Sequence, residues 1–438
     1  MNKYSRFFFF VIALVFLLCG CSAIESENSN KEDHTISIVL SDEKIIVDGR
    51  EASENKKDAV YTGADIVYYE EGKDKTYGEG SKKDGHSVQE AEAHTVITIT
   101  RPGIYEVSGK ISYGQIAIDL GEDSKEDEDA VVSLILNNVE IHCSVAPAIV
   151  VYNAYECGSS IKKDAGPIVD TKNAGFHLIL AEDSENVIYG SYVAKIYEDG
   201  TTEKDIKNKD VKKKYKFDAA IDSQISFNID SEENGKLIVN AENEGISSNL
   251  HMTINNGEII INAADDSINT NKDDVSVFTM NGGTLICNSG FGEEGDGIDS
   301  NGYIVINEGL VIACANSESI DSGLDSNKGI YINGGILFTT GNMYDEVSED
   351  SKQLFIVLEF NEKIKKNDLI MMTDDKENPI MAFCAVNDYH IAVYSSPELI
   401  KGTYYFYQVS SLVGDLNTNI YTNIIVYQDK VQILYTFL

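Results

Sequence analysis

Apolar and polar residues alternate along most of the chain, and from residue 244 onward the alternation repeats at a fixed interval. The segments "INNGEIII", "MNGGTLIC", "INEGLVIA" and "INGGILFT" place four asparagines, each 26 residues after the last: Asn255, Asn281, Asn307 and Asn333. Alternating residues lie on both sides of each Asn-x-Gly corner, so each period predicts at least two short strands joined by a turn. Helical solenoids have comparable periods, but period-two alternation excludes them. The repeat therefore predicts stacked β coils.

A second motif recurs in the same frame. It reads "EGISSN", "DSINTN", "DGIDSN" and "SGLDSN" and begins at residues 244, 266, 296 and 322. Its apolar position is predicted to point inward. Its last position is predicted to form a structural ladder of amides at a bend, because side chains one coil apart lie about 4.8 Å from each other. The ladder residues are Asn249, Asn271, Asn301 and Asn327.

These patterns predict an all-β protein built around a parallel β-helix, with coils of about 22–30 residues. The β-helix is expected to span residues 56–345. After Tyr344 the corners stop while strong alternation continues, so residues 346–438 are predicted to form a separate antiparallel β module that caps the coils. Residues 121–129 and 193–214 are acidic or lysine-rich and are predicted to be surface insertions.

The first 20 residues have the layout of a secretory signal. A short basic start precedes the apolar run "FFFFVIALVFLLCG", whose end, "LCGC", resembles a bacterial lipobox. In that resemblance Cys21 is the lipidated first residue of the mature protein, and residues 21–55 form a flexible tether. The alternative is an uncleaved membrane anchor, for which the apolar run is short. We expect a lipoprotein held at the extracellular face of the bacterial cytoplasmic membrane.

The charge of the chain limits its partners. The net charge is −37, and removal of Lys3 and Arg6 with the signal would leave 33 basic and 72 acidic residues, or −39. Such a surface repels nucleic acid, and it also repels acidic polymers unless divalent cations lie between the two. After Cys21, five cysteines remain without a CxxC pair, which argues against a zinc site or a full disulfide framework. Cys287 and Cys314 follow strand residues in successive repeats, where they could be stacked neighbours.

Acidic residues cluster around the inward position of the second motif. They are Glu244, Asp265, Asp266, Asp296, Asp299, Asp321 and Asp325, and the six aspartates are the expected metal ligands. Carboxylates stacked one coil apart repel each other, and a hard cation such as Ca²⁺, which takes six to eight oxygen ligands, is the usual remedy. The alternative is that these acids only form turns, which Asp and Asn favour for local reasons.

The order of several segments resembles a family of bacterial carbohydrate-binding domain-containing proteins. The resemblance rests on "ITRPGIYEVSGKIS", "LILNNVEIH", "LILAEDSENVIYGS", "GDGIDSNGYIVINEG" and "YSSPELIKGTYYFY", and covers about residues 95–412. These are secreted or lipid-anchored clostridial proteins similar in fold to polysaccharide lyases. The resemblance implies a right-handed parallel β-helix, calcium at the coil turns, and binding of plant cell-wall polymers such as pectin and cellulose with little or no cleavage.

Catalytic alternatives have weaker support in the sequence. A hydrolase would use two carboxylates of "AADDSIN", yet the regular repeats contain one histidine, His251, and no arginine as supporting charges. A calcium-dependent pectate-lyase-type enzyme would need a base such as Lys272 or Lys328. A structural protein that binds another cell-wall protein is a third alternative. The sequence favours a non-catalytic, calcium-dependent polysaccharide-binding protein and does not identify the sugar-binding residues.

Overall fold

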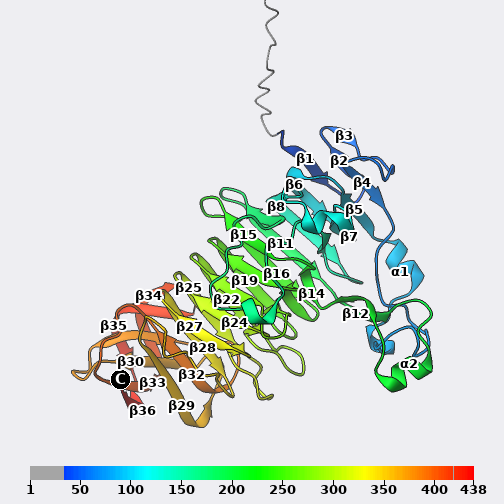
Figure 1. The fold of residues 1–438 in the computed structure, drawn as a ribbon. Coiled ribbons are helices and arrows are strands. Elements are labelled where there is room, and N and C mark those ends of the chain that lie inside the picture. The colour runs from blue at the N-terminus through cyan, green and yellow to red at the C-terminus, as the bar shows by residue number, and fades with distance from the viewer. Residues whose placement is uncertain (1–33, 418) are drawn as a thin grey trace, which may run out of the picture. The chain divides into compact units, whose positions relative to one another are not determined.

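The computed structural model describes residues 34–417 and 419–438, of which Thr35–Leu438 form one compact unit. This unit is nearly all β, with its strands in several sheets rather than in one closed solenoid (Figure 1). The predicted signal segment and Cys21 lie outside the described residues. Within the part that is described, no helix is long and apolar enough to span a membrane.

Two series of parallel strands make up most of a 19-stranded sheet. The first series is β1 (Ile36–Leu40), β6 (Gly103–Ile111), β8 (Val132–Cys143), β10 (Phe176–Leu180), β15 (Phe227–Ser231), β18 (His251–Ile254), β21 (Val277–Met280), β24 (Tyr303–Ile306) and β27 (Gly329–Ile332). The second series continues from the end of β8 through β11 (Glu185–Gly190), β16 (Lys236–Ala241), β19 (Glu258–Ala263), β22 (Thr284–Asn288), β25 (Leu310–Cys314) and β28 (Ile336–Gly341).

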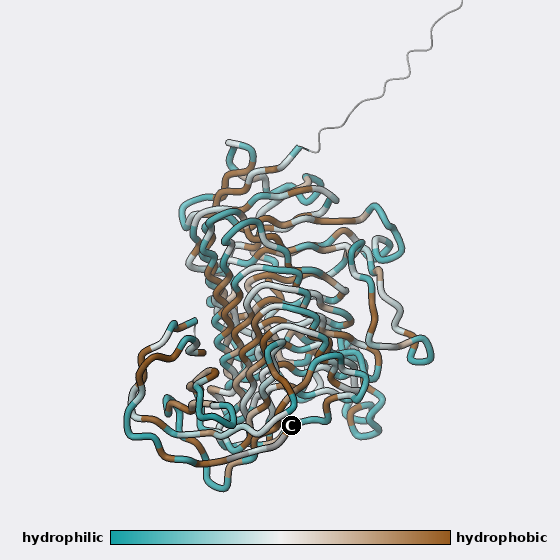
Figure 2. The backbone as a smooth tube through the Cα atoms, turned by 90° about the vertical axis from the view of Figure 1, so that its left-hand side faces the viewer, coloured by the Kyte–Doolittle hydropathy of each residue, from teal (hydrophilic) through white to brown (hydrophobic). Residues whose placement is uncertain are grey.

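A nine-stranded sheet forms a further face of the coils. It contains β4 (Val60–Gly63), β5 (Thr95–Ile99), β7 (Gly114–Asp119), β9 (Ile149–Asn153), β14 (Ala219–Ser223), β17 (Glu244–Ser248), β20 (Ile268–Thr270), β23 (Ile298–Ser300) and β26 (Leu324–Ser326). All of its pairings are parallel except that of β4 with β5. The inward-facing apolar side chains of these strands form one continuous core, and hydrophobic stretches of successive coils lie over one another in Figure 2.

The strand register follows the period that the asparagines predict. Val277 pairs with Tyr303, and Tyr303 with Gly329, so each step is 26 residues. In the nine-stranded sheet the inward residues Ile268 and Ile298 are partners although 30 residues separate them. The extra four residues, "KDDV", are confined to the turn after β20, so the pairing on either side is preserved.

The Asn-x-Gly corners depend on glycine for two reasons. Gly257, Gly283, Gly309 and Gly335 have φ angles of 103°, 80°, 93° and 78°, a region that side chains rarely adopt. In addition, a Cβ on Gly283, Gly309 or Gly335 would lie 2.5–2.7 Å from the carbonyl oxygen of the corner glycine one coil earlier. In the earlier coils, β6 and β8 are long single strands that continue through the position where later coils have this corner. At that position their pairing shifts by one residue at Asn138, whose φ is 57°.

The asparagines of the corners form a continuous amide ladder. Each asparagine donates from Nδ2 to the Oδ1 of the residue one coil earlier at 2.9 Å. The series runs from Asn333 through Asn307 and Asn281 to Asn255, which donates to Asp230. The ladder predicted in the second motif is more mixed: Asn327 donates to Asn301 Oδ1 at 3.3 Å, but Asn301 donates to the Asn271 carbonyl. Asn271 donates to Ser247 Oγ and Asn249 to Gln224 Oε1.

The predicted flexible tether extends too far. Residues 36–40 form β1, which pairs in parallel with β6 and buries Ile38 and Leu40. A short antiparallel extension, β2 (Ile46–Val47) and β3 (Arg50–Glu51), follows it. The tether prediction is therefore wrong for these strands, because the alternating "TISIVL" buries one face against the first coil.

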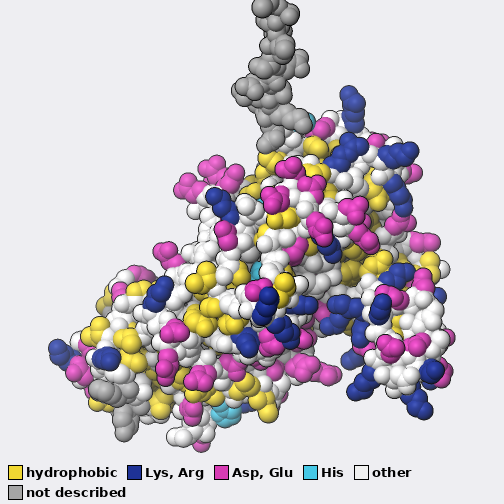
Figure 3. All heavy atoms as spheres, in the orientation of Figure 1, with side chains coloured by type: hydrophobic (Ala, Val, Ile, Leu, Met, Phe, Trp, Pro, Cys, Tyr) yellow, Lys and Arg dark blue, Asp and Glu magenta, His cyan; other side chains and the backbone are white. Residues whose placement is uncertain are grey.

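The insertion at 193–214 has secondary structure of its own. It contains β12 (Val193–Tyr197), α2 (Glu203–Asn208) and the start of β13 (Lys213–Phe217), which pairs with β12. The other α-helix, α1, spans Val88–Glu92. In the face shown in Figure 3, Lys and Arg side chains gather around this insertion, whereas acidic side chains are spread more widely.

The C-terminal strands are antiparallel but are not a separate unit. β32 (Tyr389–Ser395) pairs with β28 of the last coil and with β29 (Phe355–Ile364), so the sheet of the coils continues into the module. The remaining strands form a six-stranded sheet in the order β34 (Ser411–Asn417), β35 (Ile420–Gln428), β31 (Pro379–Phe383), β30 (Leu369–Thr373), β33 (Thr403–Val409) and β36 (Val431–Phe437). The rings of Phe338 in the coils and Phe383 in the module lie 4.0 Å apart between centroids.

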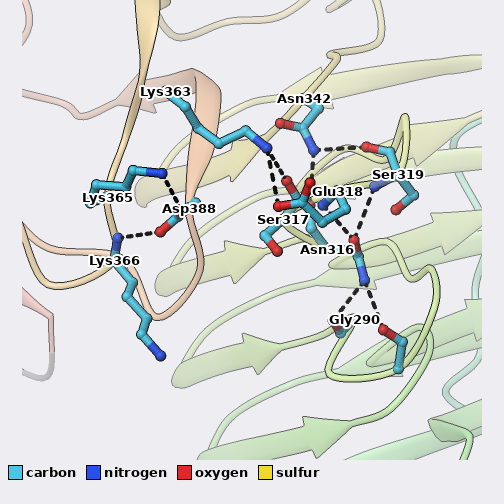
Figure 4. A network of polar contacts seen from close by, with 11 residues as sticks. Gly290, Asn316, Ser317, Glu318, Ser319, Asn342, Lys363, Lys365, Lys366 and Asp388 are labelled. Atoms are coloured by element: carbon cyan, nitrogen blue, oxygen red, sulfur yellow. Dashed lines mark hydrogen bonds and ion pairs between the residues drawn. The ribbon is translucent and has the colours of Figure 1, made fainter.

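A polar network joins the module to the coil turns (Figure 4). Asn316 donates to the Gly290 carbonyl at 2.8 Å and accepts from the backbone amides of Glu318 and Ser319. Lys363, from β29, donates to the carbonyl of Ser317 and pairs with Glu318. These bonds and the shared aromatic packing explain why the module and the coils belong to one compact unit.

All five described cysteines are free thiols, and Cys287 and Cys314 are not stacked neighbours. Cys287 pairs with Ala313, and Cys314 with Asn288, so the two cysteines are one residue out of register. Because successive strand residues point to opposite faces, Cys287 enters the core of the coils and Cys314 faces the C-terminal module.

Candidate functional site

The nine-stranded sheet aligns the motif residues that follow the inward apolar position. Asp222, Ser247, Asn269, Asp299 and Asp325 are consecutive partners on β14, β17, β20, β23 and β26. The residues before them, from Ile221 to Leu324, are buried in the core. Since neighbouring residues of a strand point in opposite directions, this polar row lies on the outer face of the sheet.

A second group of acids lies at the turn that leads into each of these strands. The carboxylate of one coil accepts a backbone amide of the next: Asp266 accepts from Asp296 N at 2.7 Å, and Asp296 from Ser322 N at 2.6 Å. In the opposite direction, Asp321 accepts from Gly295 N at 2.7 Å. We call the acids of the two groups, together with Glu244 at the start of β17 and Asp345 beyond the last repeat, the acidic column. Its members are Asp222, Glu244, Asp265, Asp266, Asp296, Asp299, Asp321, Asp325 and Asp345.

Burial and repulsion disfavour ionisation of several acids of this column. Desolvation is the largest cause for Asp296, Asp222 and Asp325, and it raises the pKa of Asp296 to about 8 and those of Asp222 and Asp325 to about 7. The pKa values of Asp265 and Asp299 rise to about 6. Nearby carboxylates add to each of these increases, and the pKa of Asp266 also rises well above its usual value. The column therefore favours positive charge, which Lys216 supplies in part near Glu244.

The most buried part of the column contains oxygens without hydrogen-bond donors. Asn269 Nδ2 donates to Glu244 Oε1 at 3.0 Å and to Asp266 Oδ2 at 3.3 Å. Glu244 Oε2 and Asn269 Oδ1 are buried and accept no hydrogen bond from any residue that the structure describes. Burial and the neighbouring acids raise the pKa of Glu244 well above its usual value. Carboxylate and amide oxygens are the ligands that Ca²⁺ prefers, so the residues at this position fit a hard cation.

The six acids predicted from the sequence all belong to this column. The structure spreads them along the sheet, and among residues 34–417 and 419–438 no three acid, histidine or cysteine side chains already converge as a metal centre. Sequence reasoning missed Asp222 and Asp345 as members. Asp222 lies in "AAIDS", which matches the second motif without its glycine, whereas Asp345 accepts from Ser326 N at 2.7 Å from beyond the last repeat, where no periodic signal exists.

The residues considered for catalysis have other environments. His251 is buried, its Nδ1 accepts from Val277 N at 3.1 Å, and burial lowers its pKa to about 4, so it is neutral. Lys328 lies 3.9 Å from Asp274, which Lys162 also contacts at 2.9 Å. Lys272 is exposed on the turn after β20. These positions give neither lysine a buried setting next to the acidic column.

We predict that the stability of the calcium-free protein falls as the pH rises from about 4 to 8. Asp265, Asp299, Asp325 and Asp296 have native pKa values of about 6 to 8, against about 3.9 in an unfolded chain. The protonated acids contribute their full stability below the unfolded value, and that contribution is lost as the pH rises through the native values, by at most about 1.4 kcal/mol per pH unit for each group.

Thermal unfolding in EDTA across this range measures the effect. Asp296→Asn should flatten the decline, whereas Asp123→Asn, at an exposed site, should leave it unchanged. A decline of equal slope in wild type and Asp296→Asn would contradict the raised pKa of Asp296.

Comparisons with known proteins agree with the sequence-based resemblance at the level of the family. A polysaccharide lyase-like protein from C. thermocellum, solved as a gadolinium derivative, aligns with a TM-score of 0.38 and 18% identity over 69% of this chain and 93% of that one. No curated protein matches the chain. The family model of carbohydrate-binding domain-containing proteins matches residues 92–355, which include the strands of the coils from β5 to β28. The chain belongs to this family of carbohydrate-binding domain-containing proteins.

Proposed function

We propose that this protein is a lipid-anchored, extracellular, calcium-dependent polysaccharide-binding protein without catalytic activity. Its ligands would be plant cell-wall polymers such as pectin. Membership of a carbohydrate-binding family supports the ligand class, and the acidic column is the observation that supports calcium. A uronate polymer and this column are both anionic, so a divalent cation held by the column could also take carboxylates of the polymer as ligands.

The calcium ligands would come from pairs of adjacent coils. Glu244, Asp266 and Asn269 supply the buried oxygens described above, and Asp296 and Asp299 extend the same column by one coil. When bound, the cation would supply the positive charge that offsets carboxylate repulsion. The hydrogen bonds that Asp266 and Asp296 already accept from backbone amides would keep the turns in place with or without the ion.

We infer further that the coils form a right-handed parallel β-helix. Support comes from the parallel pairing of strands one repeat apart and from the single core that they enclose. Crossover connections between parallel strands of one sheet are right-handed in about 98% of cases. An experimental structure with left-handed crossovers would contradict this inference.

The alternative function is a calcium-dependent lyase of the pectate-lyase type. Its base would have to remove a proton α to a uronate carboxylate while close to the cation. Lys272 and Lys328 are the lysines nearest to the motif in sequence, but Lys328 pairs with Asp274 and Lys272 is exposed. These environments favour binding over catalysis.

We predict that calcium stabilises the native protein through Asp296 and Asp299. Binding to the native state alone should contribute about 2.7 kcal/mol at a hundredfold excess over the dissociation constant. Asp296→Asn with Asp299→Asn should remove most of the increase in melting temperature, because an amide retains oxygen for the turn but not the charge. Asp123→Asn with Asp375→Asn removes the same charge at exposed positions and serves as the control. If calcium leaves the wild-type melting curve unchanged, the acids only form turns.

We predict that polygalacturonate binds in calcium and is released by EDTA, with no unsaturated product formed. Sedimentation with the insoluble polymer measures binding, and absorbance of the unsaturated product measures cleavage. The double Asp→Asn variant should bind less than the exposed-site control. Steady product formation that is lost on Lys272→Ala or Lys328→Ala would establish the lyase instead.

The proposed anchor is Cys21, which follows the apolar run in "LCGC". Cys21→Ala should abolish incorporation of labelled fatty acid and either release the protein or leave it unprocessed, because the thiol is the lipid attachment point. Cys157→Ala, which removes another cysteine, should leave labelling unchanged. Survival of both labelling and membrane retention in Cys21→Ala would rule out the lipoprotein proposal.

A further inference from the structure

A second polar surface lies on the 19-stranded sheet, away from the strands of the acidic column. It is a groove of about 640 Å³ over β10, β15, β18, β21 and β24. Its floor follows one outward row of the sheet, in which His177, Asn228, Thr253, Thr279 and Val305 are consecutive partners. The groove therefore crosses five strands of the first series, of which β15 and β24 are labelled in Figure 1.

The amide ladder of the Asn-x-Gly corners runs beside this row and also lines the groove. Asn255, Asn281, Asn307 and Asn333 all belong to the lining. An asparagine amide has two N–H donors and an oxygen with two lone pairs. Each interior asparagine of the ladder uses one N–H donor and one lone pair to bond its neighbours. Each coil thus retains one donor and one acceptor, repeated about every 4.8 Å, a distance comparable to the length of one sugar residue in an extended polysaccharide.

One wall of the groove is held in place by the floor. Asn228 Nδ2 donates to the Thr171 carbonyl at 2.6 Å, and the hydroxyls of Thr171 and Thr253 are 2.7 Å apart. These bonds fix the segment 167–172 over the sheet without any ligand, so the groove is formed in advance. Asn228 is only 2% exposed and its Oδ1 is buried, so this side chain holds the wall in place rather than facing the groove.

The charge of the groove differs from that of the protein. Its lining contains two acids, Asp170 and Asp230, and two lysines, Lys172 and Lys352, whereas the whole chain has a net charge of −37. Asp230 is also occupied: it accepts from Asn255, and His177 lies 3.8 Å away. Dipoles rather than charges therefore dominate the floor, which matches a ligand rich in hydroxyls and without ionised groups.

We propose that this groove binds a segment of a neutral polysaccharide laid across successive coils, and that it does so without calcium. The proposal extends the proposed function, on which it rests only for the general class of ligand, and it gives the protein two sites of different chemistry. Hydroxyls of the sugar donate to and accept from the free amide positions of the ladder, while Thr279 provides a polar position on the floor. Acidic polymers belong to the column on the other sheet.

The test is calorimetric titration in EDTA with cellohexaose, mannohexaose, xylohexaose and hexagalacturonate. The groove variant is Thr279→Val with Asn333→Ala, which removes a floor hydroxyl and the last amide of the ladder. Its matched control is Thr284→Val with Asn288→Ala, because Asn288 is the last amide of a separate ladder, to Asn262, that lies outside the groove. Calcium-dependent melting shows whether each variant retains the native fold and the acidic column.

We expect at least one neutral hexasaccharide to bind in EDTA and to bind about tenfold more weakly to the groove variant, as loss of two hydrogen bonds implies. The matched control and the Asp296→Asn, Asp299→Asn variant should bind as wild type does. The proposal is overturned if no neutral hexasaccharide binds, if the groove variant binds equally well, or if hexagalacturonate occupies the groove in EDTA. Failure of the calcium proposal would appear separately, as an unchanged melting curve.

Discussion

Parallel pairing at a fixed register requires every residue of a coil to lie beside its counterpart in the next, about 4.8 Å away. The consequences of this repetition depend on the chemistry of the residue. Isoleucines repeated in this way form a core, and asparagines form a chain of hydrogen bonds, because an amide is both donor and acceptor. A carboxylate is only an acceptor, so a row of carboxylates lacks donors and accumulates charge. The same constraint thus makes one row of side chains mutually hydrogen-bonded and makes ionisation of another row unfavourable.

The two rows lie on different sheets, and this separation gives the molecule two surfaces of opposite character. On the nine-stranded sheet, the acids at the turns accept backbone amides from the next coil, and their remaining oxygens include the unpaired Oε2 of Glu244. On the 19-stranded sheet, the lining of the groove contains amides and hydroxyls, and its two acids are matched by two lysines. Under the two proposals above, these surfaces would contact charged and uncharged polysaccharides separately.

Periodicity made much of the fold and part of the site accessible from sequence. The spacing of Asn255 and its counterparts located the corners, and the motif around Ile298 located Asp296 and Asp299 on one face. Information was lost where the repeat ends. β1 follows a polar segment and was assigned to the tether, although only its pairing with β6 shows that it belongs to the coils. The groove was missed because its wall is the non-repeating segment 167–172, whose position depends on contacts of Thr171 that no local pattern encodes.

The one-residue offset between Cys287 and Cys314 has a consequence for folding under oxidising conditions. In the native pairing their side chains point to opposite faces of the sheet, although they belong to adjacent strands. A slip of one residue between these two strands would make them direct partners, at a separation that a disulfide can span. Oxidation would then trap the slipped coil covalently, with its apolar residues turned outward. A disulfide between Cys287 and Cys314 would therefore indicate that these two strands have paired one residue out of register.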